Sequence, residues 1–359
     1  MTATQGKLTQ LQQDIINNFQ KGFPLCSNPY LEIAQQLNRS RIEQDKEKKA
    51  IELSIFNALA ELDSLGVISR IGPVFDHKKA GASTLAALAV DEKELEKIAS
   101  IVNQFEQVNH NYARSSHYNK TDYNLWFVVT ASDPVTLNNT LTRIELLTGL
   151  KVLILPMEAS YHLDLAFSIN VTGTASANVN NDTSVEASDK QAHLLSEIKK
   201  TQLRKLIETG LPNHLQPYKQ LANNIDSTEQ QVVAQIAHWL QTGLIRRFGL
   251  VVKHRKLGYN ANAMVVWNID SENVDNIADK LAKREEVSLC YRRPRHLPDW
   301  PYNLFCMIHG TDKKLVLQQI ENIVKAILPD WIKEKSQINN FPNYKMGTVG
   351  AVALDKNGN

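Results

Sequence analysis

Two clusters of arginine and histidine residues carry the clearest chemistry in this sequence. The first lies between Gly243 and Trp267, and its members are Arg246, Arg247, Lys253, His254, Arg255 and Lys256. The second comes later, beside aromatic residues, and comprises Tyr291, Arg292, Arg293, Arg295, His296, Trp300 and Tyr302. Guanidinium groups bind carboxylates through paired hydrogen bonds, and aromatic faces stack on planar rings. Together the clusters indicate a site for a large, flat ligand with several negative charges.

Both clusters recur in the first half of the chain. Five positions repeat with a spacing of 177 by subtraction: Gly66, Arg70, Gly72, His77 and Gly81 match Gly243, Arg247, Gly249, His254 and Gly258. Six more repeat with a spacing of 179: Tyr112, Arg114, His117, Tyr123, Asn124 and Leu125 match Tyr291, Arg293, His296, Tyr302, Asn303 and Leu304. These constant spacings predict a tandem duplication whose two halves share one fold.

The repeated histidines are the candidate proton donors. His77 and His254 form one matched pair, and His117 and His296 form the other, each with basic neighbours. An imidazole titrates near neutral pH, so it can donate a proton or face a metal carried by the ligand. Three scattered cysteines and the lack of a His-x-His or Cys-x-x-Cys pattern argue against a zinc site of the protein's own.

The elements that must position these residues follow one order twice. Three helices and a strand pair predict a winged helix-turn-helix unit, and the following strand-helix-strand-strand-helix-strand pattern predicts a ferredoxin-like βαββαβ domain, so the fold class is α+β. Ser227 and Gln230 predict a capping box. The predicted boundaries are 1–83 and 84–171 for the first half, 172–192 for a linker, 193–260 and 261–350 for the second half, and 351–359 for a tail. The halves should pair about a pseudo-twofold axis, because each open sheet needs its exposed face covered.

Composition narrows the class of protein. The 359 residues are 43% hydrophobic and 22% charged, which is typical of globular domains. A net charge of +2 supplies no global attraction for polyanions. No run approaches the ~18 apolar residues of a membrane span, and the N-terminus lacks the apolar core of a secretory signal. We therefore expect a soluble, cytoplasmic protein that does not interact with membranes.

A DNA-binding role is the obvious alternative, since a helix-turn-helix followed by a ferredoxin-like domain is the layout of the leucine-responsive/asparagine regulators. Affinity for DNA comes mainly from Lys and Arg that face phosphates. The second half has no Lys or Arg between Lys219 and Arg246, and Asp226 and Glu229 begin its third helix. We therefore expect no DNA partner and regard the helix-turn-helix as a scaffold.

Longer segments resemble one enzyme family. GASTLAALAV, NHNYARS and YNLWFVVTA in the first half, and FGLVVKHRKLGYNANAMVVW, CYRRP and WPYNLFCMIHG in the second, resemble the sirohaem decarboxylases of the AsnC/Lrp-like group. The first half resembles one subunit type and the second its partner, so the chain is similar to a natural fusion of both. The resemblance spans nearly the whole chain, apart from the linker, residues 39–49 and the tail.

The resemblance implies a reaction and its site. Sirohaem would become 12,18-didecarboxysirohaem by loss of two acetate carboxyl groups, a step toward the dioxo-isobacteriochlorin haem of nitrite reductase or haem itself. The implied carboxylate-binding residues are Arg247, Arg255, Arg293, Arg295 and, from the first half, Arg114. His254 is the first choice as acid, with His296, His110 or His117 as second acid or iron-facing group. Tyr291, Tyr112 and Tyr302 would donate hydrogen bonds or stack.

The denser basic cluster places the main site in the second half. The iron would arrive within sirohaem, so the resemblance implies no metal or cofactor of the protein's own. Two other functions stay open: a tetrapyrrole-responsive AsnC/Lrp-type transcription regulator and an inert tetrapyrrole carrier. The association of two chains is left open as well.

Overall fold

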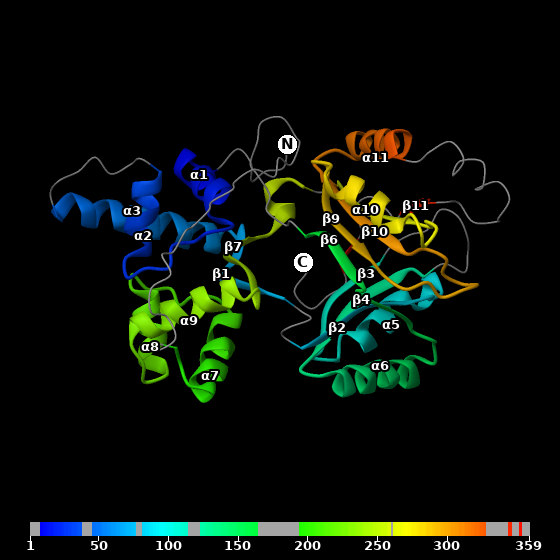
Figure 1. Cartoon of the computed structure of the whole chain (residues 1–359), viewed down its shortest axis with the longest axis horizontal. Coiled ribbons are helices and arrows are strands. Elements are labelled where there is room, and N and C mark those ends of the chain that lie inside the picture. The colour runs from blue at the N-terminus through cyan, green and yellow to red at the C-terminus, as the bar shows by residue number, and fades with distance from the viewer. Residues whose placement is uncertain are drawn as a thin grey trace. The chain divides into compact units, whose positions relative to one another are not determined.

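The computed structural model describes residues 8–37, 45–76, 81–113, 123–163, 194–259, 261–327, 344–346 and 352–353. These residues form two compact units (Figure 1). The first, here the helical unit, combines the described residues before position 80 with those from 194 to 258. The second, here the sheet unit, combines those from 81 to 163 with those from Tyr259 onward. Each unit thus draws on both halves of the duplicated sequence.

The helical unit contains two sets of three helices and one strand. The first half supplies α1 (Gln10–Phe19), α2 (Pro29–Gln36), α3 (Asp45–Ser64) and β1 (Ile68–Phe75). The second half supplies α7 (Glu197–Glu208), α8 (Pro217–Asn224), α9 (Glu229–Gln241) and β7 (Ile245–Val252), followed by the 3-10 turn η2 (His254–Leu257). The capping box of α9 consists of Thr228 and Gln231, so the prediction of Ser227 and Gln230 was wrong by one residue.

The two strands of the helical unit form a single ribbon that crosses the helix ends. β1 and β7 pair antiparallel, with Gly72 opposite Gly249. A Cβ atom on Gly249 would lie 2.5 Å from the carbonyl oxygens of Phe19 and Gln20, at the end of α1. A Cβ on Gly72 would lie 3.2 Å from the Cα of Gly210, just after α7. Glycine is therefore required for the close approach of backbone to backbone.

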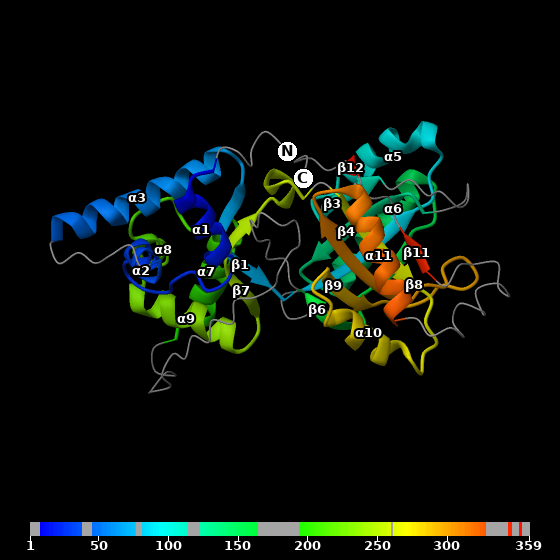
Figure 2. The same cartoon turned by 90° about the horizontal axis from the view of Figure 1, so that it is seen from above.

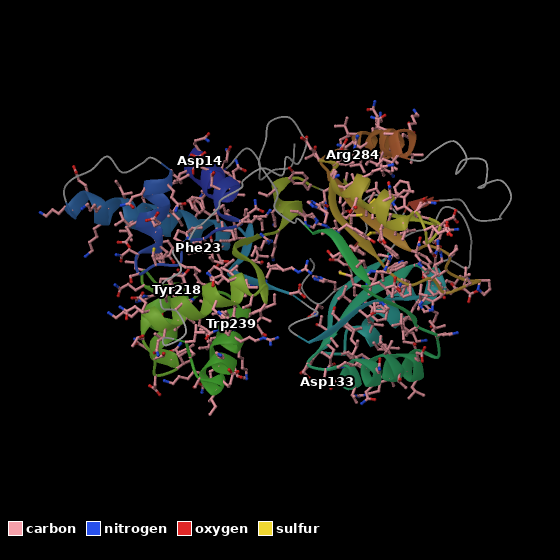
Figure 3. The ribbon with its side chains drawn as sticks, viewed as in Figure 1. Asp14, Phe23, Asp133, Tyr218, Trp239 and Arg284 are labelled. Carbon is pink, nitrogen blue, oxygen red and sulfur yellow. The ribbon has the colours of Figure 1, made fainter. Side chains whose placement is uncertain are left out.

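Equivalent hydrogen bonds hold the two halves of the helical unit together. The amide of Phe23 donates to the carbonyl of Phe248 over 3.1 Å, and the amide of Leu211 donates to the carbonyl of Ile71 over 2.6 Å. The buried hydroxyl of Tyr218 donates to the carbonyl of Pro24 over 2.8 Å; Figure 3 labels Tyr218 and Phe23. These matched contacts show that the halves are related by pseudo-twofold symmetry within this unit.

The sheet unit contains two ferredoxin-like domains, as predicted. The first consists of β2 (Ala82–Leu88), η1 (Glu92–Glu94), α5 (Leu95–Val102), β3 (Val108–Ala113), β4 (Leu125–Ala131), α6 (Pro134–Thr148), β5 (Leu153–Pro156) and β6 (Ala159–Leu163). The second consists of β8 (Ala261–Trp267), α10 (Val274–Ala282), β9 (Val287–Arg292), β10 (Leu304–Gly310), α11 (Lys313–Ile327), β11 (Tyr344–Met346) and β12 (Val352–Ala353). Both follow the βαββαβ order, and each has one further strand.

The further strand of each domain belongs to the other domain's sheet. The sheet orders are β12-β3-β4-β2-β5 and β11-β8-β10-β9-β6. On β6, Ser160 lies opposite Tyr291, and on β12, Ala353 lies opposite Tyr112. Tyr112 and Tyr291 are equivalent positions in the duplication, so the exchange is symmetrical. β12 lies within the predicted tail, which therefore contributes to the first half's sheet.

Each sheet carries helices on one face only: α5 and α6 on the first, α10 and α11 on the second (Figure 2). The opposite faces share a third buried cluster, here the inter-sheet cluster. Its buried members are Ala87, Trp126, Leu153, Leu155, Val266, Tyr291, Trp300, Tyr302 and Phe305. Because these residues come from both halves, the halves pair within the chain. No helix in the described part of the chain has the length and hydropathy of a membrane span.

Gly249→Ala should destabilise the helical unit more than Gly22→Ala does. The new methyl group at Gly249 must displace the end of α1, which is expected to cost at least about 2 kcal/mol. Gly22 has a φ of +71° but open space around it, so alanine there incurs only the left-handed backbone cost of roughly 1 kcal/mol. Chemical denaturation of both variants measures the difference. Equal losses of unfolding free energy would contradict the close approach of Gly249 to the end of α1.

Candidate functional site

Arg293 is the centre of the candidate site. Tyr291 lies on β9 and faces the inter-sheet cluster, where its ring stacks on Phe305 with centroids 5.7 Å apart. Arg293 follows immediately after β9, and its guanidinium lies 4.6 Å from the ring centroid of Tyr291 and 5.8 Å from that of Phe305. A cation over aromatic faces is stabilised by their quadrupoles, most strongly where water is excluded.

The guanidinium of Arg293 is buried and has no acidic partner among the described residues. The residue is 7% exposed, its Nη1 donates to the carbonyl of Leu155 on β5, and within the described residues its Nε has no hydrogen-bond partner. No carboxylate of the described residues pairs with it, whereas the neighbouring Arg292 contacts Asp275 at 2.9 Å and Glu158 at 3.2 Å. Burial lowers the pKa of Arg293. A buried unpaired cation costs several kcal/mol, so this position favours an incoming anion.

Aromatic rings from both halves surround Trp300. Its ring lies 5.1 Å from Tyr302, 5.2 Å from Trp126 and 5.9 Å from Tyr123, measured between centroids. Trp300, Tyr302 and Trp126 are buried members of the inter-sheet cluster. Arg293 is thus adjacent to an apolar, aromatic interior, where its charge is little screened by water.

Two other predicted site residues of this segment, Arg295 and His296, form hydrogen bonds within the protein. Arg295 directs its guanidinium to the carbonyls of Pro301 and Ile269 and to the side chain of Asn268, the first at 2.7 Å. Burial lowers its pKa. The exposed His296 has its Nε2 2.7 Å from the carbonyl of Ile154 on β5. Since a carbonyl only accepts, Nε2 carries the proton in this contact. Their roles toward a ligand stay predictions.

The first basic cluster belongs to the helical unit. Arg247 donates from Nη1 to the carbonyl of Gln20 at the end of α1 over 2.8 Å, which is the contact of a helix cap. His254 and Arg255 lie on η2, and burial, followed by the charge of Arg255, lowers the pKa of His254 to about 4. His254 is therefore a neutral imidazole at pH 7 in this structure. The binding and catalytic roles of these three residues also stay predictions.

On the first half, His110 and Tyr112 lie on β3. Their rings stack at 5.9 Å, and the tyrosine hydroxyl is 3.4 Å from Nδ1 of His110. Arg114 and His117, predicted as partners of this pair, lie outside the described residues. No group of three or more His, Cys, Asp or Glu residues in the described part of the chain is arranged to hold a metal ion.

Sequence reasoning missed the contribution of Phe305 and of the Leu155 carbonyl. Phe305 could have been found from alternation along β10, because residues that share a face with it point away from the helix-covered core. The carbonyl of Leu155 carries no side-chain signal, and its contact with Arg293 joins positions far apart in the chain. Such a contact follows only from the pairing of the two sheets.

Comparison with known proteins places these features in a family. The model described as AsnC-like ligand binding domain matches residues 79–162 and 256–334, and that of the "Siroheme decarboxylase NirDL-like HTH domain" matches residues 201–246. A "Siroheme decarboxylase NirDL subunit" of Paracoccus pantotrophus is 34% identical over 320 residues, which cover 89% of this chain and 90% of that subunit. A "Siroheme decarboxylase NirL subunit" of Stutzerimonas stutzeri is 52% identical over 130 residues, which cover 36% of this chain and 76% of that subunit.

A solved structure shares the fold. The crystal structure of the siroheme decarboxylase NirDL in co-complex with an iron-uroporphyrin III analogue superposes with a TM-score of 0.62 at 22% identity, covering 96% of this chain and 92% of that one. The identity to the Paracoccus subunit extends over both halves of the duplication and nearly the full length of each protein. The chain therefore belongs to the siroheme decarboxylase NirDL family.

Proposed function

We propose that this chain decarboxylates sirohaem and releases the acetate carboxyl groups at ring positions 12 and 18 as carbon dioxide, giving 12,18-didecarboxysirohaem. The observation that carries the proposal is the buried guanidinium of Arg293, which has aromatic faces beside it and no carboxylate partner among the described residues. Sirohaem is planar and carries several carboxylates, so it satisfies both features at once. Membership of the decarboxylase family supports the same substrate.

The chemistry requires binding, electron acceptance and one proton for each carboxyl group lost. As the bond to the carboxylate breaks, its electron pair passes to the adjacent carbon and is spread over the conjugated macrocycle. A proton then forms the new C–H bond of the methyl group. We infer that the chain needs no cofactor of its own, because the macrocycle accepts the electron pair and the iron belongs to the substrate.

The source of that proton constrains the site. His254 is neutral at pH 7 because burial and Arg255 lower its pKa to about 4. A neutral imidazole is a weak acid, so its role depends on an anionic substrate that raises the pKa on binding. His296 uses its Nε2 proton to bind Ile154, so a proton leaving Nε2 would break that contact. A proton from His254 therefore requires a change in its surroundings, and a proton from Nε2 of His296 requires loss of the contact with Ile154.

The direct test is anaerobic incubation of the purified chain with sirohaem, followed by mass spectrometry. We expect two successive mass losses of carbon dioxide and no change in the oxidation level of the macrocycle. Heat-denatured protein serves as the control for spontaneous loss. Sirohaem that binds but keeps all its carboxyl groups would favour the carrier hypothesis and exclude the enzyme.

Arg293→Gln should weaken binding of sirohaem by about 30- to 5,000-fold, since removing one partner of a buried charge pair costs roughly 2–5 kcal/mol. Arg293→Lys should recover only part of this loss, because an ammonium cannot form the two-point contact. Titration of the substrate's absorbance measures both affinities. Arg143, an exposed residue of α6 that lies over Phe105, provides the matched control in Arg143→Gln. Equal affinities of the Arg293 and Arg143 variants would contradict the assignment.

The imidazole of His254 should titrate with a midpoint near pH 4 in the free chain. Between about pH 6.5 and pH 4 the unfolded chain binds a proton here that the folded chain does not. Its contribution to the free energy of unfolding therefore falls as the pH is lowered, by about 3 kcal/mol at most. NMR titration, with His254→Gln to assign the signal, measures the midpoint. A midpoint at pH 6 or above would show that the imidazole is not buried as described.

A further inference from the structure

The two halves of the sheet unit carry a β-bulge at the same position. In β9, Leu289 pairs with Met307 and Val287 with Ile308, which leaves Ser288 as the extra residue. In β3, the same interruption leaves Asn109 as the extra residue, between Val108 and His110. Asn109 and Ser288 are 179 positions apart, the spacing of the duplication. Bulges redirect a side chain, and this pair does so in both halves.

The redirected side chains make the same contact with different chemistry. Asn109 donates from Nδ2 to the hydroxyl of Thr130 on β4. Ser288 has its Oγ 2.7 Å from Nδ1 of His309 on β10. Thr130 and His309 are also 179 positions apart. A neutral amide–hydroxyl pair in the first half is thus a serine–histidine pair in the second, and only the second contains an imidazole, a group that can serve as a general acid.

The hydrogen bonds define how His309 is held. Ser288 also donates to the carbonyl of Met307 over 3.0 Å. A hydroxyl has one proton, so Ser288 can donate either to this carbonyl or to a bare Nδ1 of His309. When His309 is an imidazolium, Nδ1 carries a proton and must donate to Oγ of Ser288, which then donates to Met307. Ser288 thereby orients the ring in both forms. In the second half, the residue opposite the bulge is therefore a histidine whose orientation is fixed by the bulge contact.

His309 lies on the face of the sheet that carries the candidate site. Residues 305, 307 and 309 alternate to the same side of β10, and Phe305 is the ring beneath Tyr291 and Arg293. Phe305 and His309 are four residue steps apart along the strand, or about 13 Å. That distance is of the order of the breadth of a tetrapyrrole with its acid side chains. His309 is 7% exposed, as Arg293 is.

We propose that His309, oriented by Ser288, is an acid of the decarboxylation and protonates one of the two acetate-derived carbons. The inference rests on the proposed function. The carboxylates of bound sirohaem favour the imidazolium form of His309. As carbon dioxide leaves, the electron pair left on the carbon takes a proton from this imidazolium, an N–H bond breaks and a C–H bond forms. A proton from solvent restores the imidazolium, which matches the one proton consumed per carboxyl group. Nothing in this step is oxidised or reduced.

The double variant Ser288→Asn/His309→Thr tests the proposal, because it installs the pair that the first half already accommodates at the equivalent bulge. We expect sirohaem affinity, from absorbance titration, to stay within about threefold. In single-turnover experiments followed by mass spectrometry, at least one of the two losses of carbon dioxide should slow by about 10²- to 10⁴-fold. Thr130→Ser, the matched change in the first half, should leave both rates unchanged. His309→Gln, measured in the same way, covers the case in which the double variant does not fold.

The positioning role of Ser288 can be tested separately from the role of His309 as an acid. Ser288→Ala should lower the single-turnover rate by about tenfold with unchanged affinity, whereas Ser288→Thr, which keeps the hydroxyl, should restore it. Rates within threefold of the parent for both His309 variants, or a loss confined to affinity, would overturn the proposal and leave the decarboxylase function intact. A parent chain that releases no carbon dioxide would overturn both.

Discussion

The fold of the sheet unit depends on covering the helix-free face of each of its two five-stranded sheets. Each ferredoxin-like domain packs its helices on one face of its sheet, and the opposite face is rich in apolar and aromatic side chains. Left in water, that face would lose about 25 cal/mol for each Å² of apolar surface. The duplication solves this within one chain, because the two faces share one cluster and the domains exchange β6 and β12. Arg293 and Tyr291 are buried as a consequence of this pairing.

Much of the architecture was predictable because it is written in local patterns. The order of helix and strand patterns and the 177- and 179-residue spacings indicated the duplicated helix-turn-helix and βαββαβ order, which the structure and the family comparison confirm. The exchange of β12 was not predictable, since a strand of two residues that pairs with a distant strand leaves no periodic signal. The capping box on α9 was misplaced by one residue because Ser227 and Thr228 both have hydroxyls that can cap.

Charge was the least predictable part of the site. The positions of the arginines and the alternation of side chains along strands predicted basic faces. Instead, the guanidinium of Arg247 caps α1, and that of Arg295 donates to carbonyls near the end of β8. Arginine carries five donors, and a folded chain supplies many carbonyl acceptors, so the partner of each arginine follows from tertiary packing. Arg293 differs from these two arginines because it is buried and no carboxylate of the described residues pairs with it. Sequence could name it as a candidate, while only the sheet pairing distinguishes it from its neighbours.

Duplication also allows one half to change while the other preserves the fold. The β-bulge occurs in both halves, so its backbone geometry serves the sheet in each. The Asn109–Thr130 contact satisfies the bulge with neutral groups, and the Ser288–His309 contact satisfies it with a titratable one. The two residues at such a bulge can thus differ in type between the halves while the hydrogen bond between them is kept. Asymmetry at such matched positions separates the residues that build the fold from those that are free to act on a ligand.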